Sequence, residues 1–387
     1  MSEAVVVIGA GQAAAQLAAS LRQGGFGAPI VVIGDEPYPP YQRPPLSKKF
    51  LIERPAPDSL YLRAPGFWDE QKVTLMLGTP VAAVDAAARR VMLADRRAID
   101  FGILAFATGT RARALPLPGA DLPGVFSVRK IDDIRQLRPA LDDARRAVIV
   151  GAGYIGLEVA AGMRAEGREV TLLEAEDRVM KRVTGRAISD FFDAFHRARG
   201  VDLRLGARLA AITGEARATG VRLADGAEIA ADLVLVATGA KVNDEIAAAA
   251  GIACEDGILV DESAATNVAG VYAIGDCARF PSRRYGRHIR LECVQNAIDQ
   301  AKAAAAAMLG KGERYDPVPW FWSDQYDLKL QIAGLMDGHD QADTIGDPAS
   351  ARFSVEYRKA GRLIAVDAVN DGRAYMTARR RIAEETA

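Results

Sequence analysis

The sequence predicts an α/β protein in which two similar domains, one inserted into the other, precede a smaller α+β domain. Two observations support this plan. A buried strand, a glycine turn and the start of a helix occur at residues 5–15 and recur at residues 147–157, and a strand meander ending in Thr-Gly follows each copy. The chain after residue 319 instead alternates polar and apolar residues with period two, which is typical of antiparallel strands.

Each glycine turn has the residue types that hold the pyrophosphate of a dinucleotide. Gly9 and Gly151 allow the chain to reverse after the strand, and Gly11 and Gly153 let main-chain N–H groups approach the anion. The N-terminus of the following helix then stabilises its negative charge. The third position of the motif is Ala14 in the first copy and glycine in the second, and both are small enough for close packing of helix and strand.

An acidic residue follows the next apolar run in each copy, Asp35 in the first and Glu174 in the second. A carboxylate at this place hydrogen-bonds a ribose diol, so we interpret both copies as Rossmann-like dinucleotide sites rather than as plain strand-to-helix turns. Glu174 favours NADH, because its charge would repel the 2′-phosphate of NADPH. Arg178 and Arg182 follow closely in the sequence and would act in the opposite direction.

The connecting segments divide the chain into three predicted domains. Residues 114–124 are rich in Pro and Gly and form the predicted linker, and the strand at 271–274 ends in Gly-Asp, where open α/β sheets bind ligands. A return connection therefore inserts the second domain into the first. We expect a dinucleotide domain at residues 1–112 and 243–318, a second one at 113–242, and an α+β domain at 319–387.

Composition predicts a soluble, cytoplasmic enzyme. The 387 residues carry a net charge of −1, with a pI near 6.4, which gives no reason to expect nucleic acid or a membrane surface as a partner. No apolar run approaches the ~18 residues of a membrane span, and no export leader precedes the first strand. Three cysteines and three scattered histidines predict neither a disulfide framework nor a metal site.

Three further segments give the chain a family resemblance. They are the proline-rich loop at 41–48, whose prolines predict a rigid, non-helical loop, the segment 290–297 that opens an alanine-rich helix, and residues 319–325. With them, the chain resembles the FAD-dependent, NADH-using ferredoxin reductases of bacterial cytochrome P450 and ring-hydroxylating dioxygenase systems, the putidaredoxin reductase type. The resemblance implies a glutathione-reductase-type pair of Rossmann-like domains, with FAD in the first and NADH in the second.

The resemblance also implies which residues hold each cofactor. Asp35 would bind the adenosine ribose of FAD, Asp276 its ribityl chain, and Val294 the pyrimidine side of the flavin, where a helix N-terminus stabilises negative charge. The residues expected at FAD are Gly9, Gly11, Gln12, Ala13, Ala14, Asp35, Glu36, Arg43, Lys48, Val81, Thr108, Gly109, Arg129, Asp276, Glu292, Val294 and Trp322. Those expected at NADH are Gly151, Gly153, Tyr154, Ile155, Gly156, Glu158, Glu174, Arg182 and Gly239.

Lys48 and Glu158 are expected at the reacting edge of the flavin. Equivalents in related flavoproteins form an ion pair beside flavin N5 and the nicotinamide, and a carboxylate in a crevice packed against the cofactors is costly unless it is paired. The alternative is that Glu158 only favours the start of its helix. Hydride would pass from nicotinamide C4 to flavin N5, and electrons would leave singly to an iron–sulfur protein.

Two other functions fit the same architecture. A disulfide, peroxide or coenzyme A-disulfide reductase needs a redox cysteine close to the flavin, but Cys254, Cys277 and Cys293 lack the paired spacing and the loop at 45–48 contains none. A flavoprotein like apoptosis-inducing factor, or a general NADH oxidase, would act without a dedicated ferredoxin.

The predicted partner is an acidic [2Fe–2S] ferredoxin that passes electrons to a P450 or another oxygenase. A basic cluster beside the flavin segment would steer such a partner, and the alternative is an ordinary solvated loop. The sequence does not fix the oligomeric state, and we expect a monomer or a weak dimer. The cluster consists of Arg283, Arg284, Arg287, His288 and Arg290.

Overall fold

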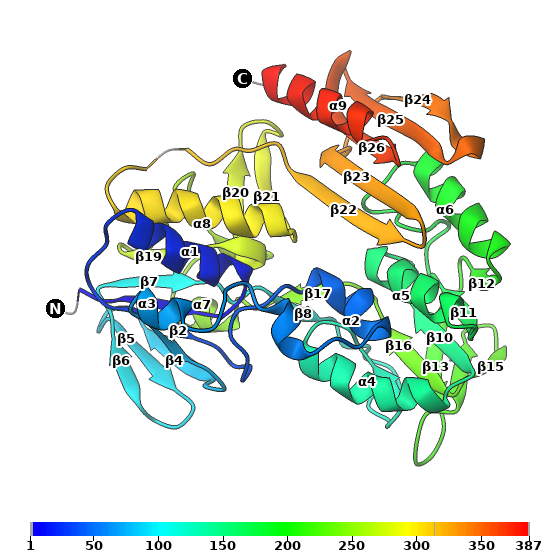
Figure 1. The fold of residues 1–387 in the computed structure, drawn as a ribbon, viewed down its shortest axis with the longest axis horizontal. Coiled ribbons are helices and arrows are strands. Elements are labelled where there is room, and N and C mark those ends of the chain that lie inside the picture. The colour runs from blue at the N-terminus through cyan, green and yellow to red at the C-terminus, as the bar shows by residue number, and fades with distance from the viewer. Residues whose placement is uncertain (1–2, 313, 386–387) are drawn as a thin grey trace. The chain divides into compact units, whose positions relative to one another are not determined.

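A computed structural model describes residues 3–312 and 314–385 of the chain. The chain forms two compact units, each made of segments that are distant in the sequence (Figure 1). Unit one contains the chain up to Gln42, together with Pro57–Arg111 and Lys241–Pro319. Unit two contains Arg43–Ala56, Ala112–Ala240 and the chain from Trp320 onward.

Unit one is built on a five-stranded parallel sheet. Its apolar strands form a continuous core with the helices α1 (Gln12–Gln23) and α8 (Val294–Met308), which pack against each other. Parallel strands of this kind are buried on both faces, which explains why their residues are apolar without alternation. The strand order is β19 (Val271–Ala273), β7 (Ile103–Phe106), β1 (Val5–Ile8), β2 (Ile30–Ile33) and β3 (Val73–Met76).

Smaller elements complete unit one. Two three-stranded sheets lie outside the main sheet, and short helices connect them. The first sheet joins β4 (Val81–Asp85), β5 (Arg90–Leu93) and β6 (Ala98–Asp100), and the second joins β18 (Ile258–Leu259), β20 (Ala278–Ser282) and β21 (Arg287–Arg290). The short helices are η2 (Pro57–Leu60), α3 (Phe67–Glu70), α7 (Glu245–Ala249) and η3 (Gly275–Cys277).

Unit two repeats the plan of unit one. Its parallel sheet again has the strand before the glycine turn at the centre, and an antiparallel meander precedes the fourth strand. The parallel sheet has the order β12 (Val201–Arg204), β11 (Glu169–Leu173), β10 (Arg146–Val150), β16 (Leu233–Val236) and β9 (Val125–Phe126), and the meander is β13 (Leu209–Thr213), β14 (Gly220–Leu223) and β15 (Glu228–Ala230). The helices are α4 (Ile131–Asp143), α5 (Tyr154–Ala165) and α6 (Arg186–Ala198).

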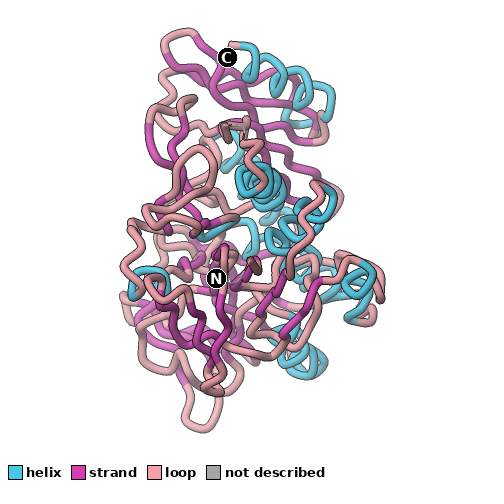
Figure 2. Tube along the Cα trace, turned by 90° about the vertical axis from the view of Figure 1, so that its left-hand side faces the viewer, coloured by secondary structure: helices cyan, strands magenta, loops and turns pink. Residues whose placement is uncertain are grey.

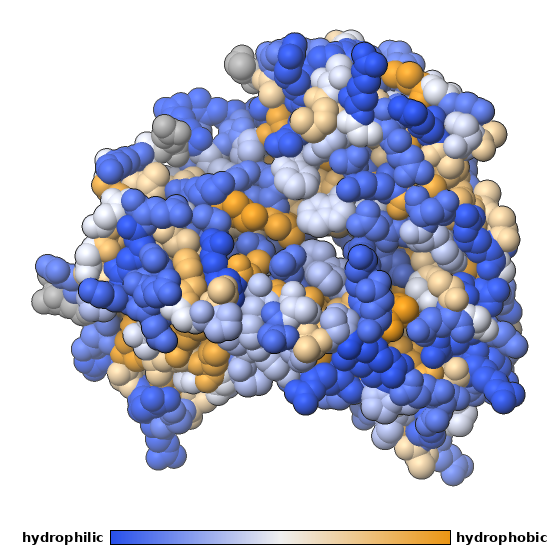
Figure 3. Space-filling model, in the orientation of Figure 1, coloured by the Kyte–Doolittle hydropathy of each residue, from blue (hydrophilic) through white to orange (hydrophobic). Residues whose placement is uncertain are grey.

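Helix α4 shows why such sequences form surface helices. Ile131, Ile134, Leu137 and Leu141 are buried along one stripe, whereas most of the intervening residues are polar or charged. The side of this helix that is visible in Figure 3 is accordingly hydrophilic. Where the chain passes between the two units, β8 (Thr110–Ala112) and β17 (Ala240–Val242) pair in a two-stranded sheet.

The C-terminal part of the chain is an antiparallel sheet with one helix, as the period-two pattern predicts. The sheet has the order β22 (Trp320–Gln325), β23 (Leu328–Gly334), β26 (Arg362–Val369), β25 (Arg352–Lys359) and β24 (Gln341–Asp347), and η4 (Pro348–Ser350) precedes β25. Helix α9 (Gly372–Glu384) packs on β26 and β23 (Figures 1 and 2). In the division into two compact units, this C-terminal sheet groups with unit two.

The proline-rich loop differs from the expectation of a purely non-helical segment. Pro44 and Pro45 open a short 3₁₀ helix, η1 (Pro44–Ser47), and α2 (Lys49–Ile52) follows it. Proline suits the first positions of a helix because its missing N–H would have no partner there. Residues 43–56 belong to unit two, and the Ile52 side chain lies where a Cβ added to Gly162 of α5 would be only 3.1 Å away. No helix in the described residues is long and apolar enough to cross a membrane.

A buried carboxyl group joins the C-terminal sheet to α6. Asp367 of β26 is about 1% exposed, and its carboxylate accepts a hydrogen bond of 2.7 Å from the phenol of Tyr357. That phenol oxygen accepts a hydrogen bond of 3.0 Å from the N–H of Gly185, the residue before α6. Burial raises the pKa of Asp367 to about 7, although the hydrogen bonds from Tyr357 and Gly185 oppose the shift.

We expect Asp367 to make the protein less stable as the pH rises from about 4 to about 7. Its carboxyl group titrates near its ordinary pKa of about 3.9 in the unfolded chain and near 7 in the folded protein, so deprotonation favours the unfolded state in this interval. Asp367→Asn removes the titration and keeps an acceptor for Tyr357. The free energy of unfolding of each protein is measured by urea denaturation at about pH 5 and about pH 7.5. Between these two values it should fall less in Asp367→Asn than in the wild type. Asp343→Asn, at a half-exposed position of the same sheet, is the control, and an unchanged fall in Asp367→Asn would contradict the prediction.

Candidate functional site

The first glycine turn joins three neighbouring strands of unit one. Gly9 has φ = +106°, and its N–H donates a hydrogen bond of 2.7 Å to the carbonyl of Ile33 at the end of β2. A Cβ at Gly9 would lie 2.2 Å from the carbonyl oxygen of Ala107, just beyond β7. Both the backbone angle and the close approach therefore require glycine here.

The N-terminus of α1 fits a pyrophosphate. Gly11 is the residue before the helix, and in the described chain no side chain caps it and no acidic residue occupies the first turn. The first N–H groups of a helix have no partner within the helix, and they attract an anion. A Cβ at Gly11 would meet no atom within 4 Å, so there is space beside these donors. Gln12, Ala13 and Ala14 form the first turn of α1, and their backbone is therefore suited to the phosphates of FAD.

The two acids after β2 differ in their surroundings. Asp35 is exposed, whereas Glu36 is buried and its carboxylate accepts a hydrogen bond of 2.6 Å from the phenol of Tyr41. The strand register corrects the parallel between Asp35 and Glu174, because Ile8 pairs with Ile33 while Val150 pairs with Leu173. The position equivalent to Glu174 is thus Gly34, where a Cβ would lie 2.6 Å from Ala10 Cβ, and Asp35 comes one residue later.

The remaining predicted FAD residues of unit one lie on four segments. Thr108 and Gly109 follow β7, and the Thr108 hydroxyl donates 2.6 Å to the carbonyl of Asn243, whose side chain donates back to the Thr108 carbonyl. Asp276 follows β19, and its carboxylate accepts a hydrogen bond of 3.5 Å from Thr110. Val81 is the first residue of β4, Glu292 accepts from Arg290 at 2.6 Å, and Val294 is the first residue of α8.

The second glycine turn repeats the first. Gly151 has φ = +105°, its N–H donates to the carbonyl of Leu173 at 2.8 Å, and a Cβ on it would lie 2.5 Å from the carbonyl oxygen of Ala237. Gly153 precedes α5, and no side chain of the described residues caps that helix. One difference is that a Cβ on Gly156 would lie 1.9 Å from Gly151 O, so the helix approaches this turn too closely for any side chain.

Glu174 binds the glycine turn directly. Its carboxylate accepts hydrogen bonds from the N–H groups of Ala152 at 2.7 Å and Glu176 at 3.0 Å. The Arg178 guanidinium is engaged by other groups of unit two. It donates to the carbonyls of Thr184 and Lys181 and to a serine hydroxyl. Arg178 and Arg182 are the two arginines expected to counteract the preference of Glu174 for NADH. The hydrogen bonds of Arg178 within unit two occupy its guanidinium and reduce its capacity to do so.

The end of β16 lies close to Arg182 and is followed by Thr238 and Gly239. A Cβ on Gly239 would lie 3.7 Å from the Arg182 guanidinium. The Thr238 hydroxyl between β16 and Gly239 is buried and has no hydrogen-bond partner within the described structure. An orphaned hydroxyl beside a glycine turn fits a site completed by a bound dinucleotide. Sequence reasoning missed Thr238, although its counterpart Thr108 in the first copy is among the predicted residues.

Lys48 and Glu158 form an ion pair inside unit two. The ammonium lies 2.7 Å from Glu158 Oε2, and the side chains are 19% and 4% exposed respectively. Ser47 donates 2.6 Å to the same oxygen, and Ser323 of β22 donates 2.6 Å to Oε1. A carboxylate on the second turn of a helix is thereby buried, charged and fully hydrogen-bonded, which the bare preference for a helix start does not explain.

Four residues expected at FAD belong to unit two. These residues include Lys48, described above, and Arg43, whose guanidinium donates 2.7 Å to the carbonyl of Arg129. Trp322 lies on β22 and packs against Trp320 and Phe321. The contact of Arg43, Lys48, Arg129 and Trp322 with FAD stays a prediction.

The cysteines are poor candidates for redox chemistry. Burial raises the pKa of Cys254 to about 11 and that of Cys293 to about 12, and it also raises the pKa of the buried Cys277 thiol. All three therefore remain protonated at neutral pH, whereas a redox-active cysteine reacts as the thiolate. None is in a disulfide in the described part of the chain.

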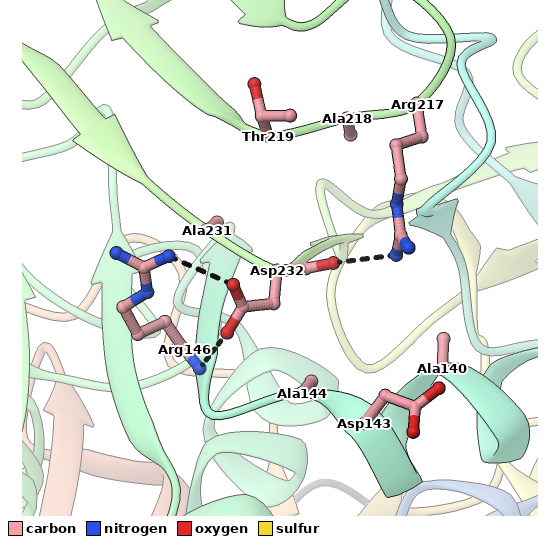
Figure 4. Close-up of a pocket in the computed structure, with 9 residues that line it drawn as sticks. All are labelled: Ala140, Asp143, Ala144, Arg146, Arg217, Ala218, Thr219, Ala231 and Asp232. Carbon is pink, nitrogen blue, oxygen red and sulfur yellow. Dashed lines mark hydrogen bonds and ion pairs between the residues drawn. The ribbon is translucent and has the colours of Figure 1, made fainter.

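A separate hollow of about 340 Å³ lies at the other end of the unit-two sheet (Figure 4). Arg146 begins β10 there and pairs with Asp232 at 3.0 Å, and Arg217 donates 3.2 Å to the Asp232 carbonyl. Arg146 and Arg217 are thus both engaged with Asp232. The nine residues that line it include none of the predicted site residues, which lie beyond the carboxyl end of β10.

Comparisons with known proteins identify the family. The model described as pyridine nucleotide-disulphide oxidoreductase matches residues 3–306, and that described as reductase C-terminal matches residues 320–387. Rhodocoxin reductase of Rhodococcus erythropolis is 44% identical over 98% of this chain and 90% of that protein. The crystal structure of the ferredoxin reductase for the CYP199A2 system from Rhodopseudomonas palustris matches with a TM-score of 0.97 and 42% identity, covering 100% of this chain and 96% of that one. The reductase in a covalent putidaredoxin reductase–putidaredoxin complex matches with a TM-score of 0.96 and 38% identity, covering 99% and 93%.

The chain belongs to the pyridine nucleotide-disulphide oxidoreductase family, the class that its two glycine turns and parallel sheets define. Within that family it belongs with the ferredoxin reductases of the putidaredoxin reductase type. The predicted fold class, enzyme class and cofactors, FAD with a nicotinamide dinucleotide, are thereby confirmed.

Gly156→Ala should weaken binding of the nicotinamide dinucleotide by about tenfold or more. The added methyl group would lie 1.9 Å from Gly151 O, so α5 has to move away from the turn that we expect to bind the pyrophosphate. The dissociation constant of NAD⁺, measured from the absorbance change of the oxidised flavoprotein, tests this. Gly162→Ala on the same helix is the control, because its methyl group would meet only the flexible Ile52 side chain. Equal dissociation constants for the two variants would contradict the prediction.

Proposed function

We propose that this protein transfers electrons from NADH through FAD to an acidic [2Fe–2S] ferredoxin that supplies a cytochrome P450 or a ring-hydroxylating oxygenase. The observation that carries the proposal is the presence, in one chain, of two glycine turns of the same geometry, each fitted to a dinucleotide. The likeness to rhodocoxin reductase and to a reductase that forms a complex with putidaredoxin supports the identity of the electron acceptor. We place the protein in the cytoplasm, which suits its three free thiols.

The residues divide the work between binding and alignment. The chemistry that bound FAD supplies is acceptance of a hydride and release of single electrons. Gly9 and Gly11 open the first turn to the pyrophosphate of FAD, and Gly151 and Gly153 do so for the nicotinamide dinucleotide. The chain then needs no nucleophile or general base, because alignment of the two reacting rings supplies most of what the protein contributes.

Glu158 and Lys48 are the charged pair that we assign to the reacting edge. Glu158 lies on α5 four residues after Tyr154, so both side chains lie on the same face of the helix that begins at the second glycine turn. The ion pair at 2.7 Å compensates the charge of the Lys48 ammonium, which also donates a hydrogen bond of 3.3 Å to the carbonyl of Pro44, so that one of its three donors is left for a cofactor. A compensated cation of this kind stabilises negative charge on a neighbouring ring without itself being reorganised.

Glu174 should make the enzyme selective for NADH. Its carboxylate is fixed by Ala152 and Glu176, so it cannot turn away from a 2′-phosphate, and Arg178 is engaged elsewhere. In an anaerobic titration NADH should bleach the flavin absorbance. In steady-state assays the kcat/KM for NADPH should be lower than that for NADH by about a hundredfold. Glu174→Gln should lose about tenfold in kcat/KM for NADH and narrow this ratio. The exposed Glu176→Gln is the control. Protein that is colourless, or that NADPH reduces as fast as NADH, would contradict the proposal.

The basic cluster beside the flavin segment is the surface that we assign to the ferredoxin. Arg290 is only 13% exposed and pairs with Glu292 and Asp256, so its charge is largely compensated. Arg283 pairs with Glu262 at 2.6 Å but remains 60% exposed. Arg287 and His288 are exposed at the start of β21. The outward-facing part of the cluster is therefore Arg283, Arg287 and His288.

Arg287→Glu should raise the KM for an acidic ferredoxin by about five- to tenfold and reduce its dependence on salt, because complementary charge mainly accelerates encounter. Reduction of ferricyanide by NADH, which bypasses the ferredoxin, should be unchanged. Reduction of cytochrome c through added ferredoxin provides the measurement. Arg96→Glu, on the exposed turn between β5 and β6, is the matched control. A flavoprotein without a dedicated ferredoxin would instead show no acceleration by ferredoxin in any variant.

A further inference from the structure

The carboxylate of Glu158 is held from two directions. Lys48 and Ser47 donate to Oε2 at 2.7 and 2.6 Å, and both come from the proline-rich segment. The hydroxyl of Ser323 donates to Oε1 at 2.6 Å, and it comes from the C-terminal sheet, 165 residues further along the chain. Both oxygens of a carboxylate that is 4% exposed are thus bound, so its plane is fixed.

Ser323 is itself oriented by a buried chain of side chains. Gln325 Nε2 donates 3.1 Å to Ser323 Oγ, and Gln325 Oε1 lies 2.9 Å from Nε2 of His196 on α6. Ser323, Gln325 and His196 are all at most 1% exposed. Burial also lowers the pKa of His196, which keeps the imidazole neutral at neutral pH.

The hydrogen bonds of this chain have a single direction. The Ser323 hydroxyl gives its proton to the carboxylate, so its oxygen must accept from an amide N–H of Gln325. The carbonyl oxygen of Gln325 then faces His196, which must carry its proton on Nε2. The other ring nitrogen, Nδ1, is buried without a hydrogen-bond partner among the described residues, so the imidazole is oriented by its hydrogen bond to Gln325 and by packing against the Tyr326 ring.

The strand that supplies this chain matches the helix that carries Glu158. Phe321, Ser323 and Gln325 alternate along β22 and therefore lie on one face of the sheet. Tyr154 and Glu158 are one helical turn apart on α5, and the rings of Tyr154 and Phe321 lie 4.6 Å apart. Two successive pairs, Tyr154 with Phe321 and Glu158 with Ser323, thus join β22 to the beginning of α5.

We propose that Ser323 and Gln325 are positioning residues, through which the C-terminal sheet fixes the orientation of the Glu158 carboxylate and thereby of Lys48. The inference rests on the proposed function in one respect, the placement of this ion pair at the reacting edge. It assigns the C-terminal sheet a part in hydride transfer, and this part does not require that sheet to touch either cofactor. Ordinary core packing is the competing explanation, and it predicts a loss of stability without a selective loss of rate.

Ser323→Ala should lower the rate constant of flavin reduction at saturating NADH by about tenfold, because one charge-assisted hydrogen bond to Glu158 is lost. The dissociation constant of NAD⁺, measured without turnover from the difference spectrum, should change by less than about threefold, and the Tm should fall by only a few degrees, because the loss of one buried hydrogen bond costs about 1–3 kcal/mol. Ser323→Thr, which keeps the hydroxyl, should recover most of the rate. Ser354→Ala is the matched control, since Ser354 is equally buried on β25 of the same sheet.

Gln325→Glu tests the direction of the hydrogen bonds from Gln325 to Ser323 and from Ser323 to Glu158. It replaces Ser323→Ala as the test if that variant folds poorly. The introduced carboxylate still accepts from His196, but it cannot donate to Ser323, and it competes with Glu158 for the Ser323 proton. It should therefore reproduce the loss of rate caused by Ser323→Ala.

A double-mutant cycle separates positioning from packing. In a Glu158→Ala background, Ser323→Ala should change the rate by less than about twofold, because the group on which it acts is gone. The inference is overturned if the flavin is reduced at the wild-type rate in both Ser323→Ala and Gln325→Glu. It is also overturned if Ser323→Ala causes the same loss of rate with and without Glu158. A wild-type protein that NADH does not reduce would instead contradict the proposed function, and it would do so before any variant is compared.

Discussion

Both dinucleotide sites depend on the close approach of two backbone segments at a glycine turn. In each copy the turn donates one N–H to the end of the neighbouring strand and leaves no space for a side chain against the carbonyl that follows the other neighbouring strand. The carboxyl ends of three parallel strands are thereby drawn to one point. The first N–H groups of the next helix face that same point, so an anion-binding site arises from backbone geometry alone. In the second copy the carboxylate of Glu174 also accepts a hydrogen bond from the N–H of Ala152, so a side chain reinforces a turn whose shape the backbone already sets.

The two copies differ in how closely the helix approaches the glycine turn. Gly156 brings the backbone of α5 within contact distance of its turn, whereas Ala14 keeps α1 at the distance of a methyl group. Glu158 lies on the second turn of this closely packed helix. The second copy thus combines close packing at the turn with a charged side chain one helical turn later. The first copy has neither, since Ala14 occupies the position of Gly156 and the uncharged Gln16 that of Glu158.

Sequence reasoning succeeded where a structural feature is encoded by neighbouring residues. The glycine turns, the strands beside them and the long helix from Val294 follow from local spacing, because backbone conformation and helix capping are decided within a few residues. It failed where the answer depends on register or on distant segments. An acid follows the apolar run in both copies, yet strand pairing puts Gly34 rather than Asp35 at the position equivalent to Glu174, because Ala10 occupies the space that a side chain would need. Ser323, 165 residues from Glu158, carries no signal in the sequence beyond its place in a period-two strand.

The polar groups buried in the C-terminal sheet explain why that sheet groups with unit two. Ser323 and Gln325 extend from β22 to α5 and α6, and Tyr357 with Asp367 extends from β25 and β26 to the N-terminus of α6. Each of these groups would be costly to bury if its partner moved away, because an unpaired donor or carboxylate loses its hydration without replacement. Apolar contacts alone would allow the sheet to slide over the helices at small cost. Directional hydrogen bonds at two places along α6 do not, so the sheet is held in one register against the helix that carries Glu158 and the helix that follows it.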